Sequence, residues 1–532
     1  MMRDVAIDAP IEAAAAIRAP VVWTGIAAFW LVLFAAVSVV NGPDGSWDLR
    51  NYHIYNPFAV LNGRLHKDLV PAQLQTFLVP TMDIPILWLR TVLNRTPDLL
   101  SAVMALPQAA GALLTCLIAA RYVPVRWRLR PLIAVAIAAV GATGTVSFST
   151  LGSVQSEMIP GCFVLAGFLF VLHGIESGAA WRNWVLAGAA FGAAAGLKLT
   201  SSPFCIAGAA TVLLASGGSA KARIARTVLF CAAMGTAILL LAGWWWAHLY
   251  ADYGNPLFPY YNNLFKSPYV PAIPFSDERF KPSGVLQAIF YPFYWGFTWE
   301  HPTSEGTLRD PRIAFALLGC IAIAASFLRR DRGRGDRPAL ALLVFFGVSY
   351  VMWERQFSIY RYIAPIEMVS GLVVFVALRR WLSGRRGLAT ATGLAAILVL
   401  VTFKLTYYPQ WGHAPRGDVA LDVQFPAAGE DGLVVLLDNF GMSYLIPYAP
   451  PGLRFVGVDN NIVYPGQTGR LQEEVERLVR TWPGPLYGLE PPGAKTQRVL
   501  DYYGLAKGPD CLPVRSTLER FVFNLCPLQR KG

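Results

Sequence analysis

Long apolar runs separated by short polar segments dominate the chain up to about residue 407. The first run, from Val21 to Asn41, is long enough for a helix that crosses a bilayer and too long for the core of a signal peptide. Ten further runs cover residues 98–120, 131–151, 157–176, 184–198, 201–217, 226–247, 311–328, 338–353, 362–379 and 387–407. The pattern predicts an all-α polytopic membrane domain over residues 1–407, with about eleven transmembrane helices.

Two long loops and a polar tail interrupt or follow these runs. Residues 42–97 and 248–310 form the loops; within the first, the apolar stretch 74–93 contains Pro80, Asp83 and Pro85. These residues predict a helix that lies on the outer surface of the membrane domain and does not span it.

The tail, residues 408–532, alternates short strand and helix patterns. The expected strands are Val434–Asp438, Phe455–Val458 and Pro485–Leu489, and the expected helices are Gly469–Trp482 and Lys495–Tyr503. Such alternation predicts a small C-terminal α/β domain.

Composition and charge agree with the membrane assignment. Hydrophobic residues make up 55 % of the 532 residues and charged residues 15 %, against roughly 25 % charged in soluble proteins. These values exclude soluble, disordered, fibrous and disulfide-scaffold classes. The net charge of +12 does not indicate nucleic acid, because the basic residues form short clusters between apolar runs.

The basic clusters also predict the orientation. Residues 121–130, 182, 221–226, 329–337 and 379–386 fall on the same side when the N-terminus is cytoplasmic and 74–93 is not a span. We therefore expect a multi-pass protein of a bacterial inner membrane, with the two long loops and the C-terminal domain in the periplasm. Cys511 and Cys526 can form a disulfide in that oxidising compartment.

The stretch just after the first helix carries the most informative polar residues. Asp48 lies a few residues beyond the membrane end of that helix, and Arg50, Tyr52 and His53 follow closely. We expect partial desolvation to raise the pKa of Asp48 and to make it a better base. The alternative is that Asp48 caps the helix that follows.

This first loop, with an acid directly after helix one and surface-lying helices behind it, resembles that of the GT-C superfamily of membrane glycosyltransferases. The superfamily includes the dolichyl-phosphate-mannose, aminoarabinose and rhizobial lipopolysaccharide transferases, and the resemblance extends over roughly residues 20–407. It implies that Asp48 is the catalytic base. Many members have two adjacent acids there, whereas this chain has Trp47-Asp48, with Asp44 as the nearest other acid.

Four further charged residues are candidates for the same site. The resemblance implies that Glu157 faces the active cavity and that Lys198 binds the donor phosphate; a helix cap and snorkelling to headgroups are the alternatives. Arg361 suits a phosphate because it is permanently charged and fork-shaped, unless it forms a surface ion pair with Glu354. Asp83 either shapes the pocket or belongs to a turn.

Loop residues supply the remaining candidates. Arg50 is a third candidate for the phosphate, and Tyr52 and His53 are candidates for the substrate pocket. Trp295 and His301 belong to an aromatic cluster suited to a sugar ring or an isoprenoid chain. His248, His301 and Glu300 carry ligand groups, but no spacing motif joins them, so no metal site is assigned and the need for a divalent cofactor stays open.

Together these features predict an inverting glycosyltransferase. The resemblance implies transfer from a polyprenyl-phosphate-linked sugar to a hydroxyl of a glycan, lipid or protein acceptor, with Asp48 as base and Lys198, Arg361 and Arg50 at the phosphate. The alternatives are a transporter or flippase for a lipid-linked saccharide, which would place its charges at the bilayer midplane, and a membrane anchor. No Walker loop is present.

Overall fold

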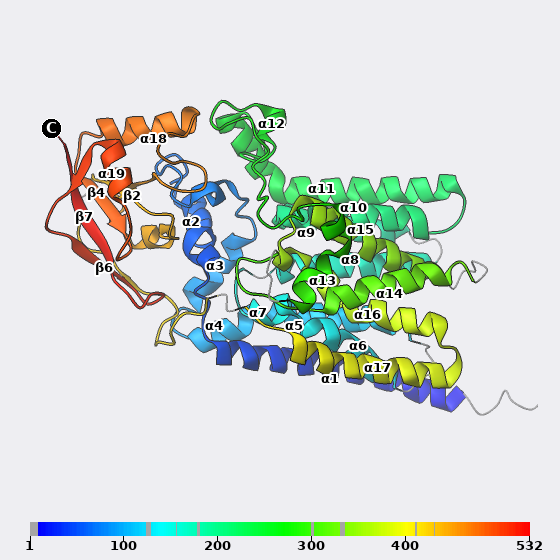
Figure 1. Cartoon of the computed structure of the whole chain (residues 1–532). Coiled ribbons are helices and arrows are strands. Elements are labelled where there is room, and N and C mark those ends of the chain that lie inside the picture. The colour runs from blue at the N-terminus through cyan, green and yellow to red at the C-terminus, as the bar shows by residue number, and fades with distance from the viewer. Residues whose placement is uncertain are drawn as a thin grey trace, which may run out of the picture.

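The computed structural model describes residues 9–123, 129–155, 157–177, 181–298, 303–329, 336–409, 412–429 and 431–531. A bundle of long helices forms one part of the molecule, and a sheet near the C-terminus forms the other (Figure 1). The first long loop lies between them. We call the end of the bundle that faces the sheet the sheet end.

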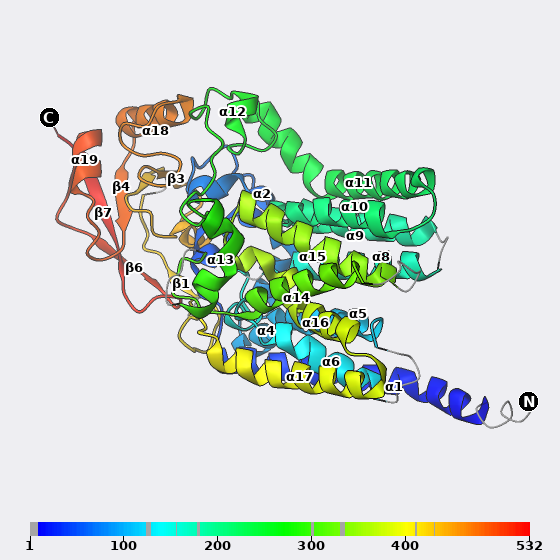
Figure 2. The ribbon, with the colours of Figure 1, turned by 45° about the vertical axis from the view of Figure 1, so that its right-hand side comes forward.

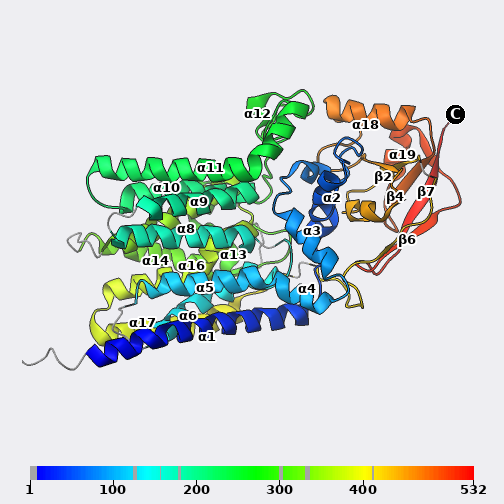
Figure 3. The ribbon, with the colours of Figure 1, turned by 180° about the vertical axis from the view of Figure 1, so that it is seen from behind.

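The helices of the bundle lie side by side (Figure 1, Figure 3). They are α1 (Ala9–Asn41), α4 (Pro97–Met104), α5 (Leu106–Ala120), α6 (Arg130–Ala142), α8 (Met158–Ser177), α9 (Trp181–Leu197), α10 (Ser202–Ala215), α11 (Ala220–Tyr253), α14 (Arg312–Ser326), α15 (Arg337–Gln356), α16 (Ala364–Trp381) and α17 (Gly384–Leu405). In the described chain, seven helices are long and apolar enough to cross a membrane, and three shorter apolar helices accompany them. The helical multi-pass membrane domain is thus confirmed, while the number of about eleven spans stays a prediction.

Glycines on α9 set its distance from α11. Gly188 and Gly192 face α11 so closely that a Cβ atom on either would collide with the backbone carbonyls of Phe230 and Met234. Small residues four positions apart allow helices in a membrane to pack backbone to backbone. Lys198 follows α9 directly, so this packing also fixes where its side chain leaves the bundle.

Basic residues with partners lie at the ends of several helices. These helix ends belong to the end of the bundle remote from the sheet, where α1 also begins (Figure 2). Arg121 at the end of α5 pairs with Glu176 at the end of α8, and Arg380 at the end of α16 pairs with Asp336 before α15. Arg226 donates to the carbonyl of Ser216, beyond the end of α10. The clusters that the sequence places on one side therefore share one end of the bundle.

The first loop folds into short helices between the bundle and the sheet (Figure 1, Figure 3). They are η1 (Leu49–His53), α2 (Tyr55–Leu61), η2 (Gln73–Phe77) and α3 (Asp83–Val92). The helix expected over 74–93 is shorter than predicted, because the segment is split into η2 and α3. Neither helix is among the candidate membrane spans of the described residues. Pro80 lies between them, where it supplies no N–H and disfavours helix in the residue before it.

The second long loop, between α11 and α14, holds α12 (Asn262–Phe265) and α13 (Val285–Phe297). Helix α13 lies beside α14 at the sheet end (Figure 1). This loop therefore also belongs to the part of the molecule in which the first loop lies.

The C-terminal sheet is mixed, with strand order β1-β6-β7-β4-β2-β3 and β5 paired to β7. Its strands are β1 (Val423–Gln424), β2 (Leu433–Leu436), β3 (Arg454–Gly457), β4 (Leu486–Glu490), β5 (Leu505–Lys507), β6 (Leu512–Ser516) and β7 (Phe523–Arg530). Strands β3, β2 and β4 are parallel, with α18 (Arg470–Thr481) between β3 and β4 along the chain and α19 (Gln497–Tyr503) after β4. The small α/β fold expected from the sequence is confirmed, although β1, β5, β6 and β7 were not expected.

A disulfide joins Cys511 and Cys526 across the β6–β7 hairpin. Cys511 directly precedes β6, and Cys526 lies within β7 opposite Gly488 of β4. The bond therefore ties the start of the hairpin to the middle of the sheet.

The first loop is joined to the sheet by backbone pairing. Leu69 donates its N–H to the carbonyl of Phe455 (2.9 Å), and Gly457 donates to the carbonyl of Leu69 (3.0 Å). Leu69 thus lies beside β3, the last strand in the sheet order, as a parallel bridge to Val456.

The close packing of α9 on α11 gives a test of the bundle. We expect Gly192→Leu to force the helices apart and to destabilise the fold by about 1–3 kcal/mol. Thermal unfolding of the detergent-solubilised protein measures this effect. Gly235→Leu on α11 is the matched control, because nothing lies within 4 Å of a Cβ atom built there. Equal unfolding temperatures for the two variants would contradict the packing described.

Candidate functional site

Asp48 and Arg361 form an ion pair at the sheet end of the bundle. Asp48 precedes η1 and is only 4 % exposed. Its Oδ2 accepts a hydrogen bond from Nη1 of Arg361 at 2.6 Å. Arg361 belongs to η5 (Tyr360–Ile363), immediately before α16. The side chain of Asp48 makes no capping hydrogen bond, so the structure does not support the alternative of a helix cap.

Neighbouring cations determine the protonation of Asp48. Burial raises the pKa of this carboxyl, but Arg361, His53 and Lys198 together outweigh burial and hold the pKa below its ordinary value of 3.8. The predicted rise in the pKa of Asp48 is therefore wrong. The prediction considered burial but not the guanidinium of Arg361, which comes from a distant segment of the chain. Asp48 is ionised at neutral pH.

Arg361 has further partners besides Asp48. Its Nη2 lies 3.6 Å from Oε1 of Glu305 in the second long loop, and its guanidinium lies 5.2 Å from the ring centre of Tyr362. Glu354, the partner expected for a surface ion pair, accepts a hydrogen bond from Tyr350 at 2.9 Å. Arg361 therefore faces the loops at the sheet end.

Lys198 and Glu157 form a second ion pair in the same region. Nζ of Lys198 lies 2.7 Å from Oε1 of Glu157, and Thr200 donates to Oε2 of that carboxylate at 2.9 Å. Only 13 % of the Lys198 side chain is exposed, so the lysine is held inward by its pair and does not extend into solvent. Lys198 is also close enough to lower the pKa of Asp48.

His53 and Asp83 form a third buried pair. Nδ1 of His53 lies 2.7 Å from Oδ1 of Asp83, the first residue of α3, and both side chains are at most 3 % exposed. Because an ionised carboxylate only accepts, Nδ1 is the donor of this bond. Nε2 of His53 is buried without a hydrogen-bond partner. The ring of Tyr52 lies 4.0 Å from the imidazole, centre to centre, and burial raises the pKa of Tyr52 well above 10.

The structure thus brings together residues that lie far apart in the sequence. Of the predicted site residues, Asp48, Tyr52, His53, Asp83, Glu157, Lys198 and Arg361 belong to the three neighbouring pairs or stack on them. Asp48 is linked to each of the other two pairs, because both His53 and Lys198 affect its pKa. We call this group the charged cluster.

Arg50 lies elsewhere. It forms an ion pair with Glu519 of the C-terminal sheet domain, and its guanidinium lies 5.0 Å from the ring centre of Phe440. The structure therefore gives Arg50 a partner in the sheet and does not place it beside Lys198 and Arg361.

The aromatic candidates have different outcomes. Trp295 is fully buried and packs edge-on against Tyr360, with ring centres 4.8 Å apart, so its faces are not open to a sugar ring. His301 lies outside the described residues.

Asp44, the other acid near Asp48, accepts hydrogen bonds from the N–H of Val154 (2.9 Å) and the hydroxyl of Ser153 (3.2 Å), which fixes the loop before α8.

The sequence analysis missed Glu305, a partner of Arg361, and a buried network around Arg312. Glu305, beside Arg361, gave no signal because an isolated acid in a polar loop is common. Arg312, fully buried, pairs with Asp310 at 2.8 Å and donates to the carbonyls of Val140 and Thr143 at the end of α6. An arginine at the start of an apolar run was the available signal, since charges within such runs are costly and paired.

Comparisons with known proteins agree with this arrangement at the level of the fold. No protein-family model and no curated protein sequence matches the chain. The crystal structure of ArnT from Cupriavidus metallidurans bound to undecaprenyl phosphate matches with a TM-score of 0.50 and 15 % identity, over 95 % of this chain and 98 % of that one. The apo state of the same protein also gives 0.50, at 14 % identity, over 94 % and 98 %.

A more distant match is the apo oligosaccharyltransferase of Archaeoglobus fulgidus, with a TM-score of 0.47 and 13 % identity, over 87 % of this chain and 69 % of that one. The likeness to ArnT shows the fold alone. The chain shares the fold of ArnT over nearly its whole length.

The Asp48–Arg361 pair gives a test of the site that is independent of any activity. Arg361→Gln leaves a buried carboxylate without its partner, and we expect it to destabilise the protein by about 3 kcal/mol. Adding Asp48→Asn removes the unpaired charge, so the double variant is expected to regain much of that loss. Unfolding of the two single variants and the double variant in detergent measures the coupling between the two residues. If the free-energy changes of the single variants add up to that of the double variant, Asp48 and Arg361 do not form the pair described.

Proposed function

We propose that the chain is an inverting glycosyltransferase of GT-C type that uses a polyprenyl-phosphate-linked sugar as donor. The observation that carries the proposal is the charged cluster, in which the carboxylate of Asp48 lies 2.6 Å from Arg361 and within electrostatic reach of Lys198. An ionised acid beside two cations, at the end of a membrane bundle, suits transfer from a lipid phosphate to an alcohol.

The proposed location is the bacterial inner membrane, with the sheet end on the periplasmic side. Support comes from the basic turns, which share the opposite end of the bundle, as expected for a cytoplasmic side. The disulfide between Cys511 and Cys526 suits an oxidising compartment.

The donor phosphate would bind between Arg361 and Lys198. In the ligand-free chain each of these cations is paired with a carboxylate, Asp48 or Glu157. The phosphodiester of the donor carries one negative charge, as a carboxylate does. It accepts two parallel hydrogen bonds from a guanidinium, so it can compete for both cations. ArnT, whose fold this chain shares, has been crystallised with undecaprenyl phosphate, which supports a polyprenyl carrier.

In the proposed reaction Asp48 accepts the proton of an acceptor hydroxyl. The acceptor oxygen forms a bond to the anomeric carbon while the bond from that carbon to the phosphate oxygen breaks on the opposite face. The electron pair of the broken bond leaves with the polyprenyl phosphate, whose added charge Arg361 and Lys198 stabilise. The acceptor class is a hydroxyl on a glycan, a lipid or a protein.

Donor binding would also strengthen the base. Arg361 and Lys198 lower the pKa of Asp48 in the free chain. A phosphate between them neutralises this positive charge, so the opposing contribution of burial then raises the pKa of Asp48. The carboxylate would become a better proton acceptor when the donor is in place.

Substitution of the base gives the first test of this function. We expect Asp48→Asn to lower the rate of sugar transfer from a polyprenyl-phosphate donor by about 100- to 10,000-fold, because an amide cannot accept the proton. Radiolabelled transfer to cell-envelope acceptors measures the rate. Asp418→Asn, at an exposed position, is the control.

Two results would count against the proposal. Full transfer by Asp48→Asn would remove Asp48 as the base. Movement of a lipid-linked saccharide across vesicles, without transfer by the unaltered protein, would favour a transporter or flippase.

The pH dependence gives a second test. The base must be ionised, so transfer falls as the pH drops through the pKa of Asp48, which lies below 3.8 in the free protein. Without Arg361 burial is opposed only by His53 and Lys198, so Arg361→Gln is expected to shift the acidic limb of kcat/KM to higher pH. Arg355→Gln, at an exposed position, should leave the limb in place. If the acidic limb of kcat/KM stays at the same pH in Arg361→Gln, the ionisation of Asp48 does not determine that limb.

A further inference from the structure

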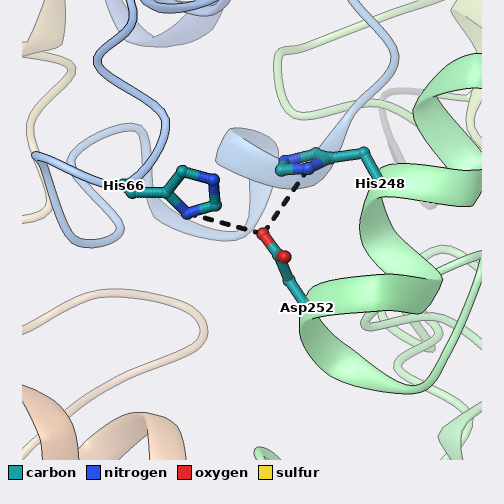
Figure 4. A group of neighbouring side chains, drawn as sticks. All are labelled: His66, His248 and Asp252. Carbon is teal, nitrogen blue, oxygen red and sulfur yellow. Dashed lines mark ion pairs between the residues drawn. The ribbon is translucent and has the colours of Figure 1, made fainter.

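A second group of titratable side chains lies apart from the charged cluster. His66 of the first loop approaches His248 and Asp252 of α11 (Figure 4). Nδ1 of His66 lies 3.6 Å from Oδ2 of Asp252, and Nδ1 of His248 lies 3.5 Å from the same oxygen. One ligand atom from each residue lies within 4.8 Å of the others. It shares no residue with the site described above.

Hydrogen bonding does not account for this arrangement. Both nitrogen–oxygen distances exceed the 2.7–3.2 Å of an N–H···O hydrogen bond, and two imidazoles converge on one oxygen. Ligands about 2.0–2.1 Å from a tetrahedral metal lie about 3.3 Å from one another. The observed 3.5 and 3.6 Å are close to that spacing, so a small closing movement of the side chains brings them to it.

We propose that His66, His248 and Asp252 bind a zinc ion. Two imidazoles and one carboxylate suit zinc, whereas calcium and magnesium prefer sets made of oxygen atoms alone. The side chains remain reachable by an ion, with 77 % of His66, 23 % of His248 and 29 % of Asp252 exposed. A cavity lined by His66, Asp68, Tyr253, Arg454 and Glu474 lies beside the group. Water would be the fourth ligand.

The ion would fasten three parts of the molecule. His248 and Asp252 stand one turn apart near the end of α11, so they form a rigid pair of ligands. His66 brings the first loop to them. Two residues further along, Asp68 accepts the N–H of Phe455 in β3 at 2.9 Å and pairs with Arg64 at 2.7 Å. Zinc at this point therefore holds the bundle, the first loop and the sheet in a fixed arrangement.

Direct binding of zinc tests the site. The full-length protein, freed of its purification tag and stripped with a chelator, is titrated with Zn²⁺ in detergent, and separately with Mg²⁺ and Ca²⁺. We expect one tight Zn²⁺ per chain and a rise in unfolding temperature of roughly 2–5 °C at saturation. His66→Ala, His248→Ala and Asp252→Asn should each weaken zinc binding more than about tenfold and abolish the rise.

His413→Ala is the matched control, since it also removes a histidine near the sheet end but not from the group. His66 lies in an exposed loop, so its variant keeps the fold and separates loss of zinc from loss of structure. Unchanged zinc affinity in His66→Ala and Asp252→Asn, or an equal response to Mg²⁺, would overturn the proposal. Neither readout requires that the chain transfer a sugar, so failure here leaves the proposed function untouched.

Discussion

Charges that leave water at a membrane boundary must find partners, and this constraint shapes the sheet end of the bundle. Asp48, Glu157 and Asp83 are almost fully buried, and each carboxylate lies against a cation or an imidazole. None of these pairs comes from neighbouring residues. An unpaired charge at such a place costs several kcal/mol, so the helices and loops that bring the partners together are fixed relative to one another.

The first loop transmits this constraint to the rest of the chain. It carries Asp48 toward the bundle, while on its other side Arg50 pairs with Glu519 and Asp68 holds the backbone of Phe455. The C-terminal sheet is therefore part of the support of Asp48, although it contributes no member of the charged cluster. The position of Asp48 and the placement of the sheet depend on the same loop.

The membrane fold could be predicted because it is a local property of the sequence. Runs of apolar residues and the side on which arginines gather do not require knowledge of distant contacts. The pKa of Asp48 could not be predicted, since its direction depends on Arg361, more than 300 residues away. The position of Trp295 could not be predicted for a similar reason. In the sequence, an aromatic residue that stacks on a sugar ring looks the same as one that packs in a core, and Trp295 packs in the core. The antiparallel strands β5 and β6 are short and partly exposed, so their alternation was too weak to detect.

Leu69 shows how the first loop protects the C-terminal sheet. Strand β3 ends the sheet, and an unpaired edge strand offers its N–H and C=O groups to any other chain. Leu69 occupies two of these groups with its own backbone. The first loop thus shields the sheet from self-association. If proteolysis released the sheet domain without this loop, the backbone groups of β3 would be unpaired and free to associate with another chain.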